Sequence, residues 1–330
     1  YSDCTEHIEE NLKILLRFVS VPYFTQESVD KERGIIAQEI RMVEDNPDWQ
    51  IYQQLLQALY VRHASRVPIA GTVESIAEIT PQTLYDCHKA FYTPANLVLT
   101  VVGDVRPDRV FEAAERILPA ESGPDIERDY GDEPEAIHQK EITRHMEVSA
   151  PQFLLGFKCP PPERGESGYR TELLGDLAWD ILLGESSPLY QRLYENGTIN
   201  GSFGGAFDTL PGAACLYAGG DCREPRKVAE AILRETERLQ TDGIDPDYWQ
   251  RMRRAAFGST LRGLNSFETI AVGLAEGCFQ GYDAFRFPRV YESIQPEDVL
   301  AFLRQNVREE RMALSRILPG QEQEKEGTDA

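Results

Sequence analysis

The stretch ITPQTLYDCHKAFYTPANLVLT, residues 79–100, returns later in the chain as IQPEDVLAFLRQNVREERMALS, residues 294–315. The two stretches align without a gap, so that Pro81 matches Pro296. Each copy predicts a helix with proline in its first turn, followed by a turn and a strand. Identity is low, but duplication is the simplest account of an ungapped match. The sequence therefore predicts an α+β fold of two related halves, each with an antiparallel-rich sheet packed by helices.

The segments around the two copies carry the other expected elements. The run LVLTVVGD, residues 97–104, is continuous and β-branched, which predicts a strand buried on both faces. Apolar periodicity predicts first-half helices over 5–20, 29–45, 48–62, the stretch from 81, and 107–118. Second-half strands are predicted within 140–148, 152–158 and 199–220, with helices at 168–184, 188–195, 224–240, 245–263 and 266–280.

An acidic segment rich in proline and glycine divides the chain. Its composition is typical of a linker, which predicts a first domain over 1–120, a linker over 121–136 and a second, homologous domain over 137–319. The tail 320–330 has no apolar residue before its terminal alanine and is expected to be disordered.

Composition excludes several classes of function. The chain has 330 residues, 41% of them hydrophobic, which is enough for a substantial core. A formal net charge of -21 disfavours binding to nucleic acid or anionic membranes. No apolar run is long enough to span a bilayer, and no secretory signal is seen. Six cysteines without a Cys-x-x-Cys pattern indicate reduced thiols and a cytoplasmic location. Because residue 1 is tyrosine, we expect a processed chain or a piece of a longer one.

Two glutamates stand out on the predicted helix 29–45. On a helical wheel, Glu32 and Glu39 fall within about 60 degrees of Ile36, inside the apolar stripe, whereas the other long charged side chains lie outside it. A buried, unpaired carboxylate costs several kcal/mol, so each must be paired, protonated or bound to a metal. One interpretation is that arginines from elsewhere pair with both, or that the edge of the stripe is partly exposed. The other is a metal site.

Residues 1–105 resemble the insulinase/pitrilysin-like zinc peptidases, or inverted zincins, and most closely their bacterial cytosolic branch. The stretches FVSVPYFTQESVDKERGIIAQEIRMVEDNP, HASRVPIAGTVESI and FYTPANLVLTVVGD carry the resemblance, which extends more weakly to about residue 318. The resemblance implies that Glu39 is a zinc ligand and that Glu32 supports a ligand histidine. It also implies that the first half is incomplete, because the family's His-x-x-Glu-His segment lies N-terminal to the part seen here.

The five histidines do not supply that segment. A catalytic zinc takes three protein ligands and keeps a position for water, and His-x-x-Glu-His provides two of the ligands and the general base. No His-x-x-Glu-His is present, and we interpret every histidine as structural or superficial; they are His7, His63, His88, His138 and His145. The chain alone is therefore expected to have no catalytic residue, to bind no catalytic zinc and to be inactive.

The second half gives no clear substrate-binding residues. Residues 187–200 resemble the segment where an arginine and a tyrosine of the family hold substrate, but Tyr194 and Asn200 occupy those positions. Arg192 is nearby and is interpreted as a surface residue. The resemblance further implies that the halves close around an unfolded peptide about the linker, with the peptide added to a strand edge.

Three hypotheses about function remain open. The first is a zinc endopeptidase that cleaves unfolded peptides, here without its His-x-x-Glu-His segment. The second is a non-catalytic family member that acts as a scaffold or peptide-binding subunit in a homo- or heterodimer with a related, active subunit. The third is an unrelated α+β protein whose two glutamates merely pair with arginines.

Overall fold

The structure is a computed structural model that describes residues 4–118, 123 and 126–320. Its second half is built on one mixed five-stranded sheet with the strand order β1-β5-β2-β4-β3. Only β1 and β5 are parallel, and the other three pairs are antiparallel. The strands are β1 (Glu141–Met146), β2 (Gln152–Cys159), β3 (Gly204–Leu210), β4 (Ala213–Asp221) and β5 (Met312–Pro319).

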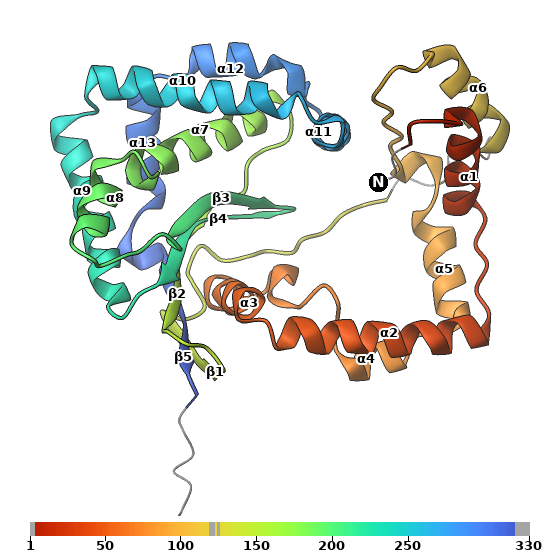
Figure 1. Ribbon diagram of the computed structural model, residues 1–330, viewed down its shortest axis with the longest axis horizontal. Helices are drawn as coiled ribbons and strands as arrows, with labels where there is room; N and C mark the ends of the chain where they lie inside the picture. The colour runs from red at the N-terminus through yellow and green to blue at the C-terminus, as the bar shows by residue number, and fades with distance from the viewer. Residues whose placement is uncertain (1–3, 119–122, 124–125, 321–330) are drawn as a thin grey trace, which may run out of the picture.

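Helices cover one face of this sheet and form the main core (Figure 1). The side chains of Phe153, Leu155 and Phe157 alternate along β2 onto that face and are almost fully buried. The covering helices are α7 (Glu166–Leu183), α8 (Pro188–Glu195), α9 (Pro225–Asp242), α10 (Pro246–Gly263), α12 (Phe287–Ser293) and α13 (Pro296–Asn306). The expected α+β layering of the second half is therefore confirmed.

The opposite face of the sheet is covered by a helix from the first half. Helix α3 (Pro47–Leu59) buries Leu55 and Leu59 against Ala313 of β5 and its neighbours. Gly156 of β2 permits this approach, because a Cβ atom there would lie 2.9 Å from the methyl groups of Leu55. A first-half helix thus belongs to the core of the second-half sheet, and the two halves share one hydrophobic layer.

The duplication inferred from the sequence is confirmed element by element. Helix α5 (Pro81–Phe91) and the 3₁₀ turn η2 (Pro94–Asn96) correspond, 215 positions on, to α13 and the turn η4 (Glu309–Arg311), with 81 matching 296 and 96 matching 311. Upstream, the turn η1 (Ala64–Arg66) corresponds to η3 (Ala284–Arg286), 220 positions on. In their order along the chain, the two helices upstream of η1, α2 (Gln26–Glu44) and α3, correspond to the two helices upstream of η3, α10 and α11 (Phe267–Gln280).

The predicted strand at 97–104 does not form a ladder, so this prediction is wrong in detail. Leu97 begins an extended segment with φ -121° and ψ 147°, but none of the described residues pairs with it. No residue of 97–104 is buried, and Leu99 is 40% exposed. The physical reason is the lack of neighbours, since its counterpart β5 lies between β1 and β2. The residues described here contain no first-half strands equivalent to those two.

The remaining first-half helices form a small separate cluster. Helix α1 (Ile8–Ser20) packs Leu12 and Leu16 against Ala113 of α6 (Pro107–Ile117). Two short helices, α4 (Val73–Ala77) and α12, had no predicted counterpart. In the described parts of the chain, no helix is both long and apolar enough to cross a membrane. The expected disorder of the tail falls on residues 321–330, which lie outside the described residues.

Candidate functional site

Helix α2 carries the two glutamates singled out by the sequence. It begins at Thr25, whose hydroxyl accepts the backbone N–H of Ser28 while Ser28 caps the Thr25 N–H in return. It ends at Glu44. Asn46 then caps the following helix α3, and Pro47 is the first residue of that helix. The predicted helix 29–45 is therefore three residues longer at its start, because the cap lies upstream of the apolar stripe.

Glu32 and Glu39 both lie on an exposed flank of α2, two helical turns or about 10 Å apart. Only Val29 and Ile40 of the apolar stripe are buried, so the edge of the stripe is open to solvent. Across 4–118 and 126–320, neither carboxylate makes a hydrogen bond or an ion pair. Of the interpretation without a metal, the partly exposed edge is what the structure shows, whereas no arginine of the described residues pairs with either glutamate.

Glu32 lies in the wall of an apolar pocket of about 330 Å³ between α2, α4 and α5. Arg33 also lines this pocket, but its guanidinium is taken by Asp30 and by the carbonyl oxygen of Ala77, 2.9 Å away. The other lining residues are mostly apolar, namely Tyr23, Phe24, Ser28, Val29, Ile36, Ile76, Ile79 and Leu84. Glu32 itself is exposed, so its carboxylate is hydrated although the residue lines the pocket.

The duplication shows what this flank of α2 would face. The N-caps Thr25 and Asp245 are 220 positions apart, as are the N-caps of the next helices, so Glu32 corresponds to Met252 of α10. Met252 is 7% exposed and packs in the core against α7. Glu39 corresponds to Ser259 by the same spacing. Glu32 therefore occupies a position that is covered in the second half, where α10 packs on α7, whereas Ser259, the counterpart of Glu39, is exposed.

The described residues do not fit a zinc site by themselves. No group of three His, Cys, Asp or Glu side chains among them is placed to hold a metal ion, whereas a catalytic zinc requires three protein ligands. Glu39 supplies one carboxylate, and no histidine lies beside it. We therefore derive no catalytic step through a metal in this chain.

The histidines have other partners in the structure. His63 is 4% exposed, and its Nε2–H donates to the carbonyl oxygen of Pro211 at 2.9 Å while Nδ1 accepts the Ser65 N–H. His88 Nε2 donates to the carbonyl oxygen of Val19 at 2.8 Å. The other three are exposed, and His7 pairs with Glu10. The roles of His7, His63 and His88 agree with the interpretation made from the sequence, whereas His138 and His145, which were expected to be structural, are exposed.

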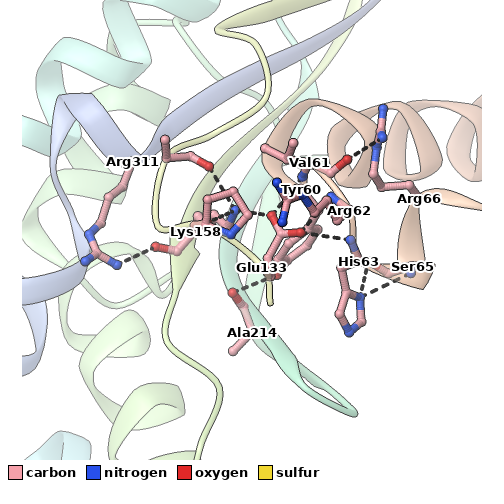
Figure 2. A network of polar contacts seen from close by, with 12 residues as sticks. Tyr60, Val61, Arg62, His63, Ser65, Arg66, Glu133, Lys158, Ala214 and Arg311 are labelled. Atoms are coloured by element: carbon pink, nitrogen blue, oxygen red, sulfur yellow. Dashed lines mark hydrogen bonds and ion pairs between the residues drawn. The ribbon is translucent and has the colours of Figure 1, made fainter. Parts of the chain in front are cut away.

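A buried polar network ties the end of the linker to both halves (Figure 2). The Glu133 carboxylate accepts the consecutive backbone N–H groups of Val61, Arg62 and His63 at 2.7–2.8 Å. It also pairs with the Lys158 ammonium of β2 at 2.5 Å, and the two side chains are 11% and 5% exposed. The same ammonium donates to the backbone carbonyls of Pro134 and Ala136. Sequence reasoning missed this anchor.

Electrostatics of the anchor favour the charged pair. Burial alone raises the pKa of Glu133, but the Lys158 ammonium and the three backbone N–H groups outweigh it and hold this pKa at about 2. Burial lowers the pKa of Lys158, against the attraction of Glu133. The short contact and the two carbonyl acceptors lead us to assign the ammonium form. The linker end is thus held in place at both halves.

In the second-half segment 187–200, the position expected for a substrate-binding arginine of the family is occupied by Tyr194. Tyr194 is half exposed and stacks on Tyr190, with ring centroids 6.0 Å apart. Arg192 is exposed as expected, but its guanidinium pairs at 2.6 Å with Glu235, which is almost fully buried. Arg192 therefore neutralises a buried carboxylate.

Comparison with known proteins agrees with the fold. A family model described as "Peptidase M16 inactive domain" matches residues 78–256. The chain is 36% identical over 323 residues to an uncharacterized zinc protease, YmfH, of Bacillus subtilis (strain 168), a match that covers 96% of this chain and 74% of the relative.

Solved structures show the same arrangement. A putative M16-like peptidase from Alicyclobacillus acidocaldarius superposes with a TM-score of 0.89 at 30% identity, over 96% of this chain and 76% of that one. A chain of Complex III2 from Candida albicans, with Inz-5 bound, superposes with a TM-score of 0.78 at 15% identity, over 96% and 78%. The second likeness shows the fold alone.

These matches define a class of protein with two duplicated α+β halves and zinc peptidases among its relatives. The chain belongs to the peptidase M16 family, and the resemblance to insulinase/pitrilysin-like zinc peptidases is confirmed at the level of the family.

Proposed function

We propose that this chain is the larger part of a zinc-dependent endopeptidase that cleaves unfolded peptides. The observation that carries the proposal is the exposed flank of α2, where neither Glu32 nor Glu39 has a partner among the described residues and where the duplicate of Glu32, Met252, is packed in a core. Zinc protease relatives support the same chemistry. Residues outside 1–330, in the same protein or in a partner chain, would complete the metal site with two histidines and a general base.

Each glutamate has a separate role in this proposal. Glu39 would be a protein ligand of the zinc, because a carboxylate oxygen is a normal ligand of catalytic zinc. Glu32, two turns earlier, would accept the free N–H of a ligand histidine and fix the orientation of its ring. When bound, the zinc would supply Lewis acidity and an activated water. The six free thiols support a cytoplasmic location for such an enzyme.

The test uses the complete reading frame that contains residues 1–330. We expect Glu39→Gln to lose zinc in elemental analysis and to lower hydrolysis of an unfolded peptide by at least a hundredfold. Glu32→Gln should lower metal affinity or activity by roughly 10–100-fold, as loss of a hydrogen-bond partner of a ligand does. Glu44→Gln, at the end of the same helix, is the control and should change neither.

Two results would contradict the proposal. One is full activity of the Glu39→Gln variant. The other is micromolar zinc binding by residues 1–330 alone that Glu39→Gln abolishes, since it would show that the metal site needs no residue from outside the chain.

A second function, that of a non-catalytic subunit, is favoured by two observations. The matched family model is described as an inactive domain, and the fold is shared with a chain of Complex III2. In that case the chain would bind peptide or a related subunit without cleaving. A complete reading frame without His-x-x-Glu-His would support the subunit, and its presence would support the enzyme.

A further inference from the structure

Strand β3 is an edge of the second-half sheet. On one side it pairs with β4, with Phe207 opposite Leu216, and on the other side no strand of the described residues pairs with it. The backbone of Phe207 lies close enough to the Asp176 carboxylate on α7 to oppose the rise of its pKa. Gly204 and Gly205, at the start of the strand, are exposed. An exposed strand edge is a template for pairing with another extended chain.

Helix α7 runs alongside this edge in the opposite direction. A Cβ atom on Gly175 would lie 2.2 Å from the ring of Phe207, and one on Gly205 would lie 2.9 Å from the indole nitrogen of Trp179. One turn of the helix, from 175 to 179, therefore spans two residues of the strand, from 207 to 205. These lengths agree, at about 6 Å for four helical residues and about 6.6 Å for two strand residues.

Three carboxylates lie on the flank of α7 that borders the edge. Glu172, Asp176 and Asp180 are spaced by four residues, and Asp176 and Asp180 are exposed. Burial by the surrounding protein, then the charges of Asp180 and Glu172, raise the pKa of Asp176 to about 7. Burial also raises the pKa of Glu172, and Glu276 of α11 adds repulsion. No lysine, arginine or histidine of the described residues pairs with any of the three.

Three other acids of the described residues that are buried or half-buried are paired with cations, whereas Asp208 accepts the hydroxyl of Tyr52. Glu133 has Lys158, and Glu141 has two arginines. Glu235 is likewise paired with Arg192 and Arg238. The α7 flank departs from this pattern, because its carboxylates are crowded, partly desolvated and unneutralised. A cationic group brought to the flank would relieve both the mutual repulsion and the partial desolvation.

We propose that the β3 edge and the adjoining α7 flank bind an extended polypeptide segment that carries Lys or Arg at alternate positions. The segment pairs with the free backbone groups of β3, and its basic side chains contact Glu172, Asp176 and Asp180. The geometry fits because side chains on one face of a strand repeat every two residues, about 6.6 Å, close to the turn-by-turn spacing of the three acids.

If the chain belongs to a peptidase, as proposed above, basic and extended peptides are its substrate class. The binding itself requires no zinc and no catalysis. A measurement of binding by the 330-residue chain therefore fails or succeeds independently of the peptidase proposal.

The experiment is fluorescence anisotropy with two labelled nine-residue peptides of equal composition. One alternates arginine with threonine and valine, and the other carries its arginines in one block. At 150 mM salt, we expect the alternating peptide to bind the wild-type chain at least fivefold more tightly. The triple variant Glu172→Gln, Asp176→Asn, Asp180→Asn should weaken its binding at least tenfold. Amide hydrogen exchange of 204–210 should slow when the peptide is added.

The matched control is Glu195→Gln, Glu237→Gln, Glu297→Gln, which removes three unpaired, exposed charges from α8, α9 and α13. Circular dichroism establishes that both triple variants are folded. Equal loss of binding in the two variants, or equal affinity for the two peptides, would overturn the proposal in favour of general attraction to an acidic surface. Self-association of the Asp176→Asn variant with unchanged peptide affinity would also overturn it, since Asp176 would then only protect the strand edge.

Discussion

At the residue scale, one lysine explains how the linker is fixed. Lys158 lies in the strand QFLLGFKC, in which Gln152 is the other long polar side chain, and it is buried there with Glu133 as its one anionic partner among the described residues. A charged residue in a buried strand must have a partner, so the lysine was a usable signal in the sequence. The sequence did not identify the partner of Lys158, because Glu133 lies 25 residues away in an acidic segment with several other carboxylates.

We expect Glu133→Gln to destabilise the protein by about 3 kcal/mol at pH 7, because it leaves the Lys158 ammonium buried without a counter-charge. The pKa of Glu133 is about 2 in the folded protein against an ordinary value of 4.5, so its contribution is complete above pH 4.5 and is lost as pH falls towards 2. Urea unfolding of both proteins across this range measures the difference.

Glu135→Gln is the control for that series. Glu135 is 91% exposed and two residues from Glu133, so its loss should change stability by less than about 0.5 kcal/mol. A wild-type advantage that stays constant between pH 5 and pH 2 would show that the Glu133 carboxylate is not held in its ionised form by this network.

At the element scale, the sequence was most informative where signals were local. The proline at the first turn of α5 and of α13, and the ungapped spacing between them, predicted the duplication that the structure contains. Residues 97–104 were misjudged because strand formation depends on neighbours that a local pattern does not reveal. The same limit applies to Glu32 and Glu39. Helical periodicity placed both on one flank, but what that flank faces became visible only through Met252 in the duplicate.

The packing of α3 on the sheet leads to a prediction about Gly156. We expect Gly156→Val to destabilise the protein by about 2 kcal/mol, because the new side chain would overlap the buried methyl groups of Leu55 and force α3 away from the sheet. The midpoint of urea unfolding measures this effect. Gly34→Ala is the control, since no atom lies within 4 Å of a Cβ there, and it should stabilise α2 by up to about 1 kcal/mol. Equal stability of Gly156→Val and wild type would show that α3 is not seated on β2 as described.

At the scale of the whole molecule, the two halves share the layer in which α3 packs on the second-half sheet, but the described first-half residues form no sheet of their own. Large apolar side chains are exposed along the first-half helices, with Phe18, Met42 and Phe111 among them, and along α11, with Phe267. In Figure 1, α11 lies on the side of the second half that faces α1 and α6. Its counterpart α3 covers a complete sheet, whereas the described residues offer α11 no sheet to cover. No sheet of the described residues covers this exposed apolar surface.

Hydrogen exchange on the 330-residue chain should separate the two halves. Helices α5 and α13 are duplicates of eleven residues each, but α5 has no buried residue, whereas α13 buries Val299, Phe302 and Leu303. Because the protection of an amide reflects the cost of opening its surroundings, the amides of α13 should exchange at least a hundredfold more slowly than those of α5. Capping is similar in both helices, since each has a capping box and an early proline, so local helix propensity cannot produce that difference. Equal protection of the two helices would mean that first-half residues are buried by contacts the structure does not contain, such as a second copy of the chain, and a concentration series would then reveal the association.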